Sequence, residues 1–391
     1  MMYTNTTLNP LPAILIGGAP NAGKSVLTYN LTQALRRRGV SHYVFRANPD
    51  GEGDWFLEAN QSIVRQVHIQ GRWSDDFVRL VCRDLTRRPL PLLVDLGGLP
   101  TERDTCIFRA CTHSLLLLKD EDMATTQQWL ELVTANGLLP LAELRSQLVG
   151  TSVLTAQDSI VTGTLVGLQR GARLSDPVFD ALVNRISQLF GSYSQHELEQ
   201  LHEDSAPTEL FLHLPHQLQE ILPGSHEWTT DALRTLLANL PTQTALSVYE
   251  RGPNWVYGAL ALHPPTMPFF QYDARLGWVS PPHLQSGTPT QATLQVEMRT
   301  HGDAYVITAH PIHSYLDYIE AEQLAFPEPP AQHGIIVSGK LPLWLFTALA
   351  RFYAQRNAPW IALHYVRTNQ SIVIYSGVAT YSVGDIVHAS L

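Results

Sequence analysis

Residues Gly334–Arg367, GIIVSGKLPLWLFTALARFYAQRNAPWIALHYVR, hold the pattern on which the predicted fold of the C-terminal part depends. The β-branched run Ile335–Val337 predicts a short strand, and a turn follows at Gly339–Pro342. Apolar residues then recur at helical spacing over Trp344–Phe352. The proline before them suits a first helical turn, because its missing N–H group costs nothing there. Trp360–Leu363 predicts a second strand, so the unit is strand, turn, helix, strand.

The same unit occurs a second time, earlier in the chain. Val248–Ala261 aligns without a gap with Val337–Ala350, and both stretches place Pro-x-Trp directly after a strand. Two further pairs follow downstream: Phe269–Arg275 opposite Trp360–Arg367, with one residue gapped, and Tyr305–Ile307 opposite Ile372–Ile374. We interpret these matches as an internal duplication. Chance similarity between two amphipathic helices is the alternative, and the shared Pro-x-Trp argues against it.

The whole chain has 391 residues, which suggests two or three domains of ordinary soluble composition. No apolar run reaches the roughly 20 residues of a membrane helix. The start MMYTNTTLNP lacks the basic region of a secretion signal. Cys82, Cys106 and Cys111 are odd in number, which predicts no disulfide framework and fits a reducing compartment. We therefore expect a cytoplasmic protein without a membrane anchor.

The charge balance narrows the class of ligand. The formal net charge is −9, whereas proteins that coat long DNA or RNA present a basic face. Long nucleic acid is therefore not an expected partner. A small anionic ligand, held by a few well-placed arginines, stays compatible with this composition.

The strongest single motif is GAPNAGKS, which begins at Gly18 and fits G-x-x-x-x-G-K-[ST]. Gly18 and Gly23 let backbone N–H groups wrap phosphates, Lys24 would reach the β- and γ-phosphates, and Ser25 would bind Mg²⁺. A short apolar strand precedes the motif, and Val26–Arg38 has the pattern of the helix that must follow. The motif predicts ATP with Mg²⁺ as cofactor. A glycine-rich turn without nucleotide is the alternative.

Further strands are predicted at Tyr43–Arg46, Pro91–Val94 and Ser114–Leu118. Asp95 follows the second of these, at the end of a buried strand, where a carboxylate beside the Mg²⁺ is expected. Asp50 could orient a water molecule or could be an ordinary turn residue. Strands alternating with helices predict a doubly wound parallel sheet.

This N-terminal part resembles the P-loop class that includes ParA/MinD-like ATPases and small kinases. The resemblance rests on GKSVLTYNLTQALRRRGV, Gly23–Val40, and on the Asp-Leu-Gly-Gly that begins at Asp95. The additional lysine of the ParA/MinD loop is absent because Ala19 stands in its place, so dimerisation through that lysine is not implied. We interpret Arg36–Arg38 as structural, since a helix dipole favours basic residues at its C-terminus.

The rest of the chain suggests where the domains divide. Further helices are predicted at Trp129–Leu138, Leu141–Leu148 and Val178–Phe190, and the polar stretch Gln195–Thr208 predicts a boundary. The expected order is a P-loop nucleotide-binding domain at 1–200, a connector at 201–240, a first copy of the duplicated unit at 241–328 and a second copy at 329–391.

Four short motifs in residues 240–391 occur in an informative order. They are Asp273-Ala274-Arg275, Ala309-His310, Gly339-Lys340-Leu341-Pro342 and Tyr381-Ser382-Val383-Gly384-Asp385. This part of the chain resembles short CRISPR-associated ring nucleases of the Csx-three type. That family shows G-[KR]-L-P before a helix, D-P-R after a strand, a Ser-His, and Y-x-V-G-D near its end. Longer members with an N-terminal P-loop domain are known, and this chain is similar to them.

The family pattern is split between the two copies. The first copy keeps Asp273, Arg275 and His310. In the second copy, Tyr365 stands at the position of the acid and Gly377 near that of the histidine. Arg367 is kept, and His364 lies where it could substitute. One competent site per chain, or a site completed by oligomerisation, is therefore expected.

The resemblance implies a nuclease for cyclic oligoadenylate, most often cyclic tetra-adenylate, the second messenger of type III CRISPR defence. It also implies a ferredoxin-like α+β fold, here duplicated, and pairing as dimers that can sandwich the ring. The P-loop domain would bind ATP to drive or regulate assembly, and a homo-oligomer is the expected state.

The implied chemistry suits these residue types. The ribose 2′-hydroxyl can attack the adjacent phosphorus, so no protein nucleophile is required. Arg275 and Arg367 would neutralise the developing charge, because guanidinium binds phosphate with two hydrogen bonds. His310 would act as general acid or base. Asp273 shares a strand face with Arg275 and could orient it or bind a metal ion, for which Mn²⁺ is a candidate.

Other interpretations stay open. His310 and His313 could be surface loop histidines, His364 a half-buried histidine, and Asp273 with Arg275 a plain salt bridge. The second half could also sense or sequester the ring without cutting it, which the lost acid and histidine favour. A P-loop kinase acting on a small nucleotide, with the C-terminal half as a lid, is a third function.

Overall fold

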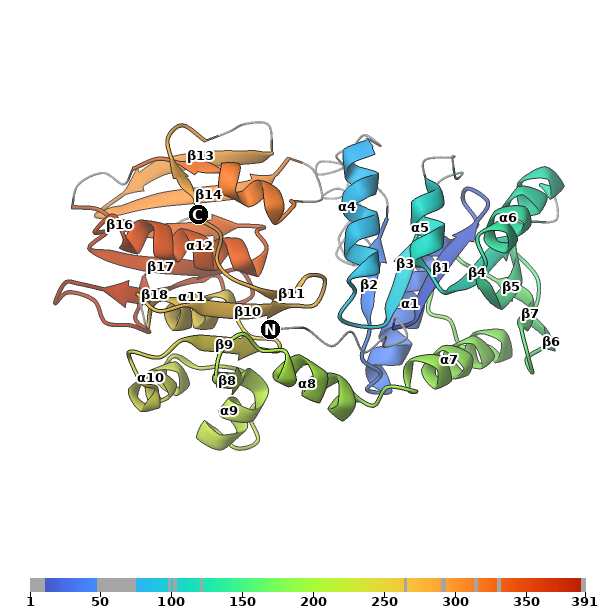
Figure 1. Cartoon of the computed structure of the whole chain (residues 1–391), viewed down its shortest axis with the longest axis horizontal. Helices are drawn as coiled ribbons and strands as arrows, with labels where there is room; N and C mark the ends of the chain where they lie inside the picture. Colours follow the sequence, from blue (N-terminus) through green and yellow to red (C-terminus); the bar gives the residue numbers. More distant parts are fainter. Residues whose placement is uncertain are drawn as a thin grey trace, which may run out of the picture. The chain divides into compact units, whose positions relative to one another are not determined.

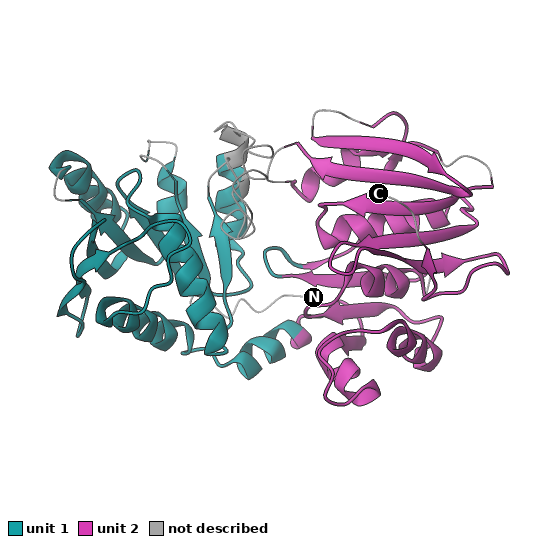
Figure 2. Cartoon of the chain, turned by 180° about the vertical axis from the view of Figure 1, so that it is seen from behind, with its two compact units in different colours: residues 1–202, 274–277 teal, residues 203–273, 278–391 magenta. Residues whose placement is uncertain are grey.

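The structure is a computed structural model that describes residues 11–47, 75–97, 100, 104–119, 122–263, 266–289, 293–312, 316–328 and 332–387. It forms two compact units, residues 1–202 with 274–277 and residues 203–273 with 278–391 (Figure 2). Two candidates from the sequence, Asp50 and His313, lie outside the described residues. None of the helices in the described ranges is long and apolar enough to cross a membrane.

A seven-stranded sheet forms the centre of the first unit, with the order β2-β3-β1-β4-β5-β7-β6 (Figure 1). Its strands are β1 (Ala13–Gly18), β2 (Tyr43–Arg46), β3 (Leu92–Asp95), β4 (His113–Leu118), β5 (Leu139–Gln147), β6 (Val153–Ala156) and β7 (Val161–Val166). Every neighbouring pair is parallel except β6 with β7. The predicted, mostly parallel N-terminal sheet is therefore confirmed.

Helices cover both faces of this sheet, because successive residues of β1 point to opposite sides. Ile14 and Ile16 share a core with α1 (Lys24–Arg37) and α7 (Pro177–Phe190). Leu15 shares a second core with the helices of the other face, which are α4 (Asp75–Thr86), α5 (Thr105–Ala110) and α6 (Met123–Ala135). The polar stretch after α7 forms α8 (Gln195–Asp204).

One predicted element of this unit was wrong. Leu141–Leu148, predicted as a helix, lies almost entirely in strand β5. This strand is paired on both sides, with β4 and with β7. Its backbone groups are therefore bonded by neighbours that are distant in sequence, and tertiary pairing overrides a weak helical pattern.

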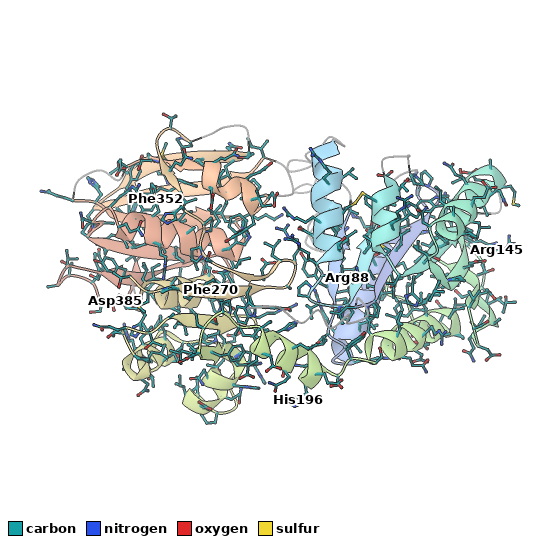
Figure 3. All side chains as sticks on the ribbon, viewed as in Figure 1. Arg88, Arg145, His196, Phe270, Phe352 and Asp385 are labelled. Carbon is teal, nitrogen blue, oxygen red and sulfur yellow. A yellow bond between two sulfur atoms is a disulfide. The ribbon has the colours of Figure 1, made fainter. Side chains whose placement is uncertain are left out.

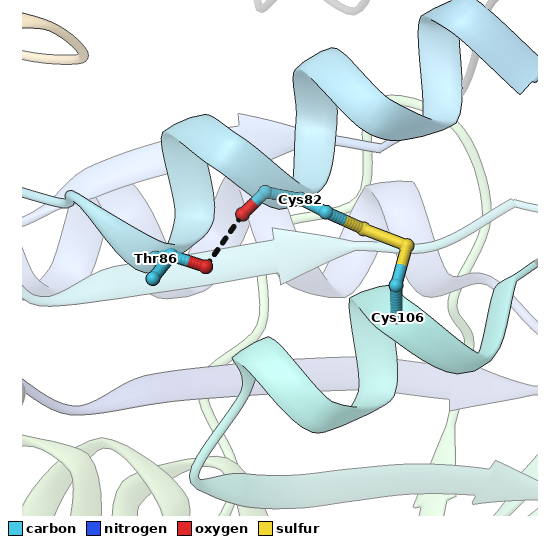
Figure 4. Close-up of a disulfide and its surroundings, with 3 residues drawn as sticks. All are labelled: Cys82, Thr86 and Cys106. Atoms are coloured by element: carbon cyan, nitrogen blue, oxygen red, sulfur yellow. Dashed lines mark hydrogen bonds between the residues drawn. A yellow bond between two sulfur atoms is a disulfide. The ribbon is translucent and has the colours of Figure 1, made fainter.

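Cys82 and Cys106 form a disulfide, so the prediction of no disulfide was wrong (Figure 4). Cys82 lies on α4 and Cys106 on α5, and these helices pack against each other. The two cysteines are 24 residues apart, and this spacing does not show that their helices meet. Cys111 is a buried thiol, and burial raises its pKa to about 12.

The second unit contains a smaller sheet of four strands, ordered β11-β10-β9-β8, and a larger sheet of six strands, ordered β13-β14-β16-β17-β18-β19. The smaller sheet contains β8 (Leu210–His213), β9 (Leu246–Tyr249), β10 (Phe269–Asp273) and β11 (Gly277–Val279). The larger contains β13 (Leu294–His301), β14 (Ala304–Pro311), β16 (Gly334–Gly339), β17 (Trp360–Tyr365), β18 (Gln370–Ser376) and β19 (Ile386–Val387). The other elements are α9 (Leu214–Ile221), α10 (Thr230–Asn239), α11 (Asn254–Leu262), α12 (Leu343–Ala354), the pair β12 (Gln285–Ser286) and β15 (Ala325–Phe326), and the 3-10 helix η2 (Ile319–Gln323).

The two sheets repeat one pattern of three parallel strands with a helix between the second and the third. The pattern is β8, β9, α11, β10 in the smaller sheet and β14, β16, α12, β17 in the larger. Val248 of β9 pairs with Gln271 of β10, and Val337 of β16 pairs with Leu363 of β17. Because Val248 and Val337 align in the sequence, these pairs fix which residues are equivalent in β10 and β17.

Arg275 and Arg367 each follow those paired residues by four positions, so the register makes them equivalent. Tyr305–Ile307 is not equivalent to Ile372–Ile374, and that part of the sequence alignment was wrong. The first stretch lies in β14, parallel to β16, and the second lies in β18, antiparallel to β17. His310, at the end of β14, therefore belongs to the larger sheet and not to the first copy.

The larger sheet also differs from the ferredoxin-like arrangement that the resemblance implied. A ferredoxin-like fold uses split βαβ units, in which another strand separates the two that the helix connects. Here β16 and β17 are connected by α12 and are hydrogen-bonded neighbours. Antiparallel β13, β18 and β19 extend this parallel centre at its edges.

Helices α11 and α12 pack against each other and reach across to the opposite sheets. Gly258 of α11 permits close contact with β17, because a Cβ there would lie 2.6 Å from Cδ1 of Leu363. Thr347 of α12 donates its hydroxyl to Oε1 of Gln271 in β10 at 2.7 Å, and both residues are buried. The two helices therefore join both sheets in one core.

The Y-x-V-G-D motif fixes the chain near its end against the larger sheet. The ring of Tyr381 lies 4.7 Å from that of Trp360. Gly384 has a φ of 92°, a left-handed conformation that favours glycine. Arg234 of α10 donates to Oδ1 of Asp385, a residue labelled in Figure 3, at 2.9 Å. In this chain the motif therefore has a structural role.

Gly334 is required by the packing of Trp360. A Cβ on Gly334 would lie 1.9 Å from Cε2 of that indole, which is 2% exposed. We expect Gly334→Ala to lower the free energy of unfolding by about 1–3 kcal/mol, the usual cost of overpacking a core. Gly377→Ala is the control, because its nearest atom lies at 3.6 Å. Equal denaturant unfolding curves for the two variants would contradict this packing.

Candidate functional sites

The first candidate site is the loop between β1 and α1, at the carboxyl end of the central parallel sheet. Gly18 and Gly23 adopt φ angles of 132° and 88°, which favour glycine. A Cβ on Gly18 would also lie 2.0 Å from the carbonyl oxygen of Leu117. The loop leads into the N-terminus of α1, where the first N–H groups have no partner within the helix. Such an arrangement binds anions.

The structure brings Lys24 and Ser25 of the motif together with Asp95, the acid chosen for its place at the end of a strand. Lys24 Nζ donates to the carbonyl oxygens of Gly18 and Ala19 at 2.9 and 3.0 Å. Ser25 Oγ donates to Oδ2 of Asp95 at 3.2 Å. Asp95 ends β3, beside Ile16 of β1, so the sheet itself brings this carboxylate to the loop.

Burial dominates the electrostatics of this site. It raises the pKa of the Asp95 carboxyl, and the positive charge of Arg46, whose Nη1 lies 3.5 Å from Oδ2 of Asp95, works against the shift. Burial also lowers the pKa of Lys24. A hydroxyl and a carboxylate in contact are ligands that suit Mg²⁺, and the lysine beside them suits phosphate. The residues present therefore fit a nucleoside triphosphate with Mg²⁺.

The second candidate site is a pocket of about 940 Å³ in the second unit. Its walls come from within residues 215–219, 225–228, 250–254, 339–346 and 364–368. Three of these segments follow the carboxyl ends of β9, β16 and β17, which is where open parallel sheets place their ligands. The starts of α11 and α12 also line it, so two helix N-termini favour negative charge there.

Basic and aromatic side chains line this pocket. Arg367 lies at its rim, with a side chain that is 70% exposed and with Nη2 2.8 Å from Oε1 of Glu227. An exposed ion pair of this kind contributes little to stability, so an anionic ligand can compete for the arginine. Arg251, Trp228 and Phe346 are further lining residues. Sequence reasoning missed the pocket role of Arg251, although its alignment with the lysine of G-K-L-P was the available signal.

Arg275 does not take the position in the pocket that Arg367 takes. It belongs to the first unit, where its Nε lies 3.6 Å from Oδ2 of Asp84. Its side chain is 14% exposed. Asp273 ends β10 in the second unit, and continuing the register of β9 and β10 by two places puts it beside Glu250. Neither Asp273 nor Arg275 is among the residues that line the pocket.

His310 and His364 lie on the larger sheet. Nδ1 of His310 accepts a hydrogen bond from the backbone N–H of Lys340 at 3.3 Å, so this exposed imidazole caps the G-K-L-P turn. Nδ1 of His364 lies 3.3 Å from Oγ of Ser371. Strand alternation puts the His364 imidazole on the face of Ala362, away from α11. Its carbonyl oxygen accepts from Nδ2 of Asn254 at 3.0 Å, and both residues are among those that line the pocket.

Residues 309–388 match a family model described as CRISPR-associated protein (Cas_csx3). The matched part begins at the end of β14 and runs through β16, α12, β17 and β18 to β19, and it contributes two of the segments that line the pocket. It covers less than half of the chain, and the first unit lies outside it. The resemblance seen in the sequence is thus shown for this part. No curated protein matches the chain.

His364 is only 7% exposed, and this burial lowers its pKa. Below its ordinary pKa of about 6.5 the unfolded chain binds a proton that the folded chain rejects. The free energy of unfolding should therefore fall as the pH is lowered from 7 to 5, and His364→Asn should reduce this slope, by at most about 1.4 kcal/mol per pH unit. Denaturant unfolding at several pH values measures it.

Ser371→Ala is the control for this measurement. It removes the hydroxyl beside His364 but leaves the imidazole buried, so the wild-type slope should persist. An unchanged slope in His364→Asn would contradict the assignment of this pH dependence to His364.

Proposed function

We propose that the second unit binds a cyclic oligoadenylate, cyclic tetra-adenylate in the first instance, in the pocket at the ends of β9, β16 and β17, and cleaves it. The observation that carries this proposal is an overlap. The segments 339–346 and 364–368 lie in the part that matches the CRISPR-associated family and also form walls of a large pocket with basic residues.

The composition of the pocket suits a small ring of nucleotides. Arg251 and Arg367 supply guanidinium groups for phosphates, and the starts of α11 and α12 add partial positive charge. Trp228 and Phe346 offer apolar surface on which bases can lie. Two cations and two helix termini are enough for a ring with a few phosphates, whereas long nucleic acid needs a wider basic face.

Cleavage would use the reactivity of the ring itself. The ribose 2′-oxygen bonds to the adjacent phosphorus as the bond from phosphorus to the 5′-oxygen breaks. The 2′-hydroxyl gives up a proton and the 5′-oxygen takes one. Arg367 and Arg251 would stabilise the charge that develops on phosphorus. Asp273 and His310 are the candidates from the sequence for the proton transfers, and neither is among the residues that line the pocket.

Mn²⁺ was the metal ion considered for ring cleavage from the sequence. Among the residues that the structure describes, no group of three or more His, Cys, Asp and Glu side chains is arranged to hold one. The proposed cleavage is written through this unit's own residues, and assays with and without Mn²⁺ test whether the ion adds to it.

For the first unit we propose binding of ATP with Mg²⁺ at the β1–α1 loop, with a role in assembly or regulation. Loop N–H groups and Lys24 would hold the phosphates, and Ser25 with Asp95 would hold the ion. The ion would neutralise phosphate charge when bound. Lys24, which now contacts carbonyl oxygens of the loop, would turn to the phosphates.

A sensor that binds the ring without cutting it is the second candidate. Three placements favour it. Tyr365 stands at the position of Asp273, the imidazole of His364 is buried against Ser371, and Arg275 lies beside Asp84. The first two leave the second copy without an acid and without an accessible imidazole, and the third leaves Arg275 of the first copy outside the residues that line the pocket.

The ring proposal predicts that Arg367→Ala and Arg251→Ala each weaken binding of cyclic tetra-adenylate about 10–100-fold, the usual effect of losing a charged hydrogen bond. Arg299→Ala on exposed β13 is the matched control and should bind as wild type does. Isothermal calorimetry measures affinity, and liquid chromatography follows the ring. Linear adenylates indicate a nuclease, and tight binding of an intact ring indicates the sensor. Absence of any binding would refute both.

The nucleotide proposal predicts that Lys24→Ala abolishes binding of ATP and that Asp95→Asn removes mainly its dependence on Mg²⁺. Binding of a fluorescent ATP analogue, titrated with and without Mg²⁺, measures both effects. Ser192→Ala, which alters an exposed serine after α7, is the control and should bind ATP as wild type does. Slow ring cleavage should survive Lys24→Ala. A kinase would instead lose all activity, and Lys24→Ala that binds ATP normally would contradict the site.

A further inference from the structure

Glu250 directly follows β9 and has a conformation that its residue type seldom adopts. Its φ is 73°, in the left-handed region. Four other described residues besides glycine share this region: Asn21, Gln332, Asn357 and Asn369. Asparagine enters it with local hydrogen bonds, whereas a glutamate there is strained. Strain of this kind, kept at a pocket wall, points to a function for the side chain.

In the second half of the unit, a glycine occupies the position that is equivalent to Glu250. Gly339 aligns with Glu250 and has a φ of 123°. At 339 a side chain is impossible, because a Cβ would lie 1.9 Å from the carbonyl oxygen of Ala309 in the neighbouring strand. At 250 the neighbouring strand β8 has already ended at His213, so there is room. The same turn therefore carries a side chain only where the pocket wall can accommodate it.

A buried hydroxyl holds the main chain of Glu250 in place. The hydroxyl of Tyr257 donates to the carbonyl oxygen of Glu250, and Tyr257 is completely buried. Burial, together with the nearby charge of Glu250, raises the pKa of Tyr257, so the hydroxyl keeps its proton. The aligned residue in α12 is Phe346, which has no hydroxyl. The half with the strained Glu250 therefore has Tyr257, whereas the half with Gly339 has Phe346. The hydroxyl is present only in the half that has the strained turn.

The carboxylate of Glu250 lies at the start of the turn before α11. Its Oε2 accepts from the backbone N–H of Arg251 at 3.3 Å. A carboxylate repels the phosphates of an anionic ligand but accepts hydrogen bonds from neutral donors. In a ring of adenosines those donors are the ribose 2′-hydroxyl and the exocyclic amino group of adenine.

We propose that Glu250 determines the specificity of the pocket by accepting a hydrogen bond from one of these neutral donors. This inference rests on the proposed binding of a cyclic oligoadenylate. The arginines attract the ring through its phosphates, and Glu250 distinguishes which nucleoside the ring contains. The local strain is retained because the side chain that causes it contacts the ligand.

The test compares Glu250→Gly and Glu250→Gln with the wild type in the full chain. Glu250→Gly should keep or raise the melting temperature, because it relieves the strain, and should weaken binding of cyclic tetra-adenylate about 10–100-fold. Glu250→Gln keeps an acceptor oxygen and should stay within about tenfold of wild type. Gln332→Gly, at the other left-handed position that carries a long polar side chain, is the control and should leave binding unchanged.

Two modified rings identify the donor. A ring lacking its 2′-hydroxyls, or a ring of inosines that lacks the amino groups, should lose affinity for wild type but not for Glu250→Gly. We call a ring coupled to Glu250 when its modification weakens binding by wild type but not by Glu250→Gly. Coupling of one ring supports the proposal and identifies the donor. No coupling to either ring would overturn it.

The remaining outcomes separate this inference from the function on which it rests. If wild type binds the ring and Glu250→Gly binds equally well, Glu250 is structural and the pocket proposal stands. If wild type binds no ring, both proposals fail.

A double-mutant cycle of Tyr257 and Glu250 tests the strain itself. Tyr257→Phe should lower the melting temperature more in wild type than in Glu250→Gly, and equal losses would overturn the link between the hydroxyl and the strain.

Discussion

The contact between α11 and α12 is the constraint on which the second unit depends. Each helix packs against its partner and reaches the sheet of the other half, through Gly258 near Leu363 and through Thr347 with Gln271. A buried hydroxyl and a buried amide that satisfy each other fix the relative position of the helices, since either group alone would be costly to bury. The same contact brings the starts of both helices to one pocket. The pocket itself therefore follows from how the halves are joined.

The loop of the first unit depends on much shorter-range effects. Gly18 is required by the close approach of Leu117, and Lys24 follows at the first turn of α1. Only Asp95 comes from far away in the sequence, and it arrives because β3 is the parallel neighbour of β1. A motif whose parts lie within eight residues can be recognised without knowledge of the sheet. A site assembled across two sheets cannot.

This difference explains what could be predicted from the sequence. The strands and helices around the loop were found because apolar periodicity and glycine placement are local, and the repeated strand-helix-strand pattern was found because it repeats. Leu141–Leu148 was mistaken for a helix and His310 was assigned to the wrong half, because strand pairing decides both. The disulfide between Cys82 and Cys106 depends on two helices meeting. The pocket role of Arg251 and Glu250 appears only when both turns are placed at one cavity.

The two halves have diverged in ways that suit different tasks. The second half keeps Gly339 and Phe346, an unstrained turn, and lies within the part that matches the CRISPR-associated family. The first half has Glu250 and Tyr257 at the aligned positions, a strained turn held by a buried hydroxyl. A symmetric ring would meet an asymmetric pocket, with an acceptor from one half and the exposed Arg367 from the other. Duplication supplies the walls of the pocket, and in our proposal both walls offer an arginine to phosphate while divergence adds the acceptor Glu250 to one of them.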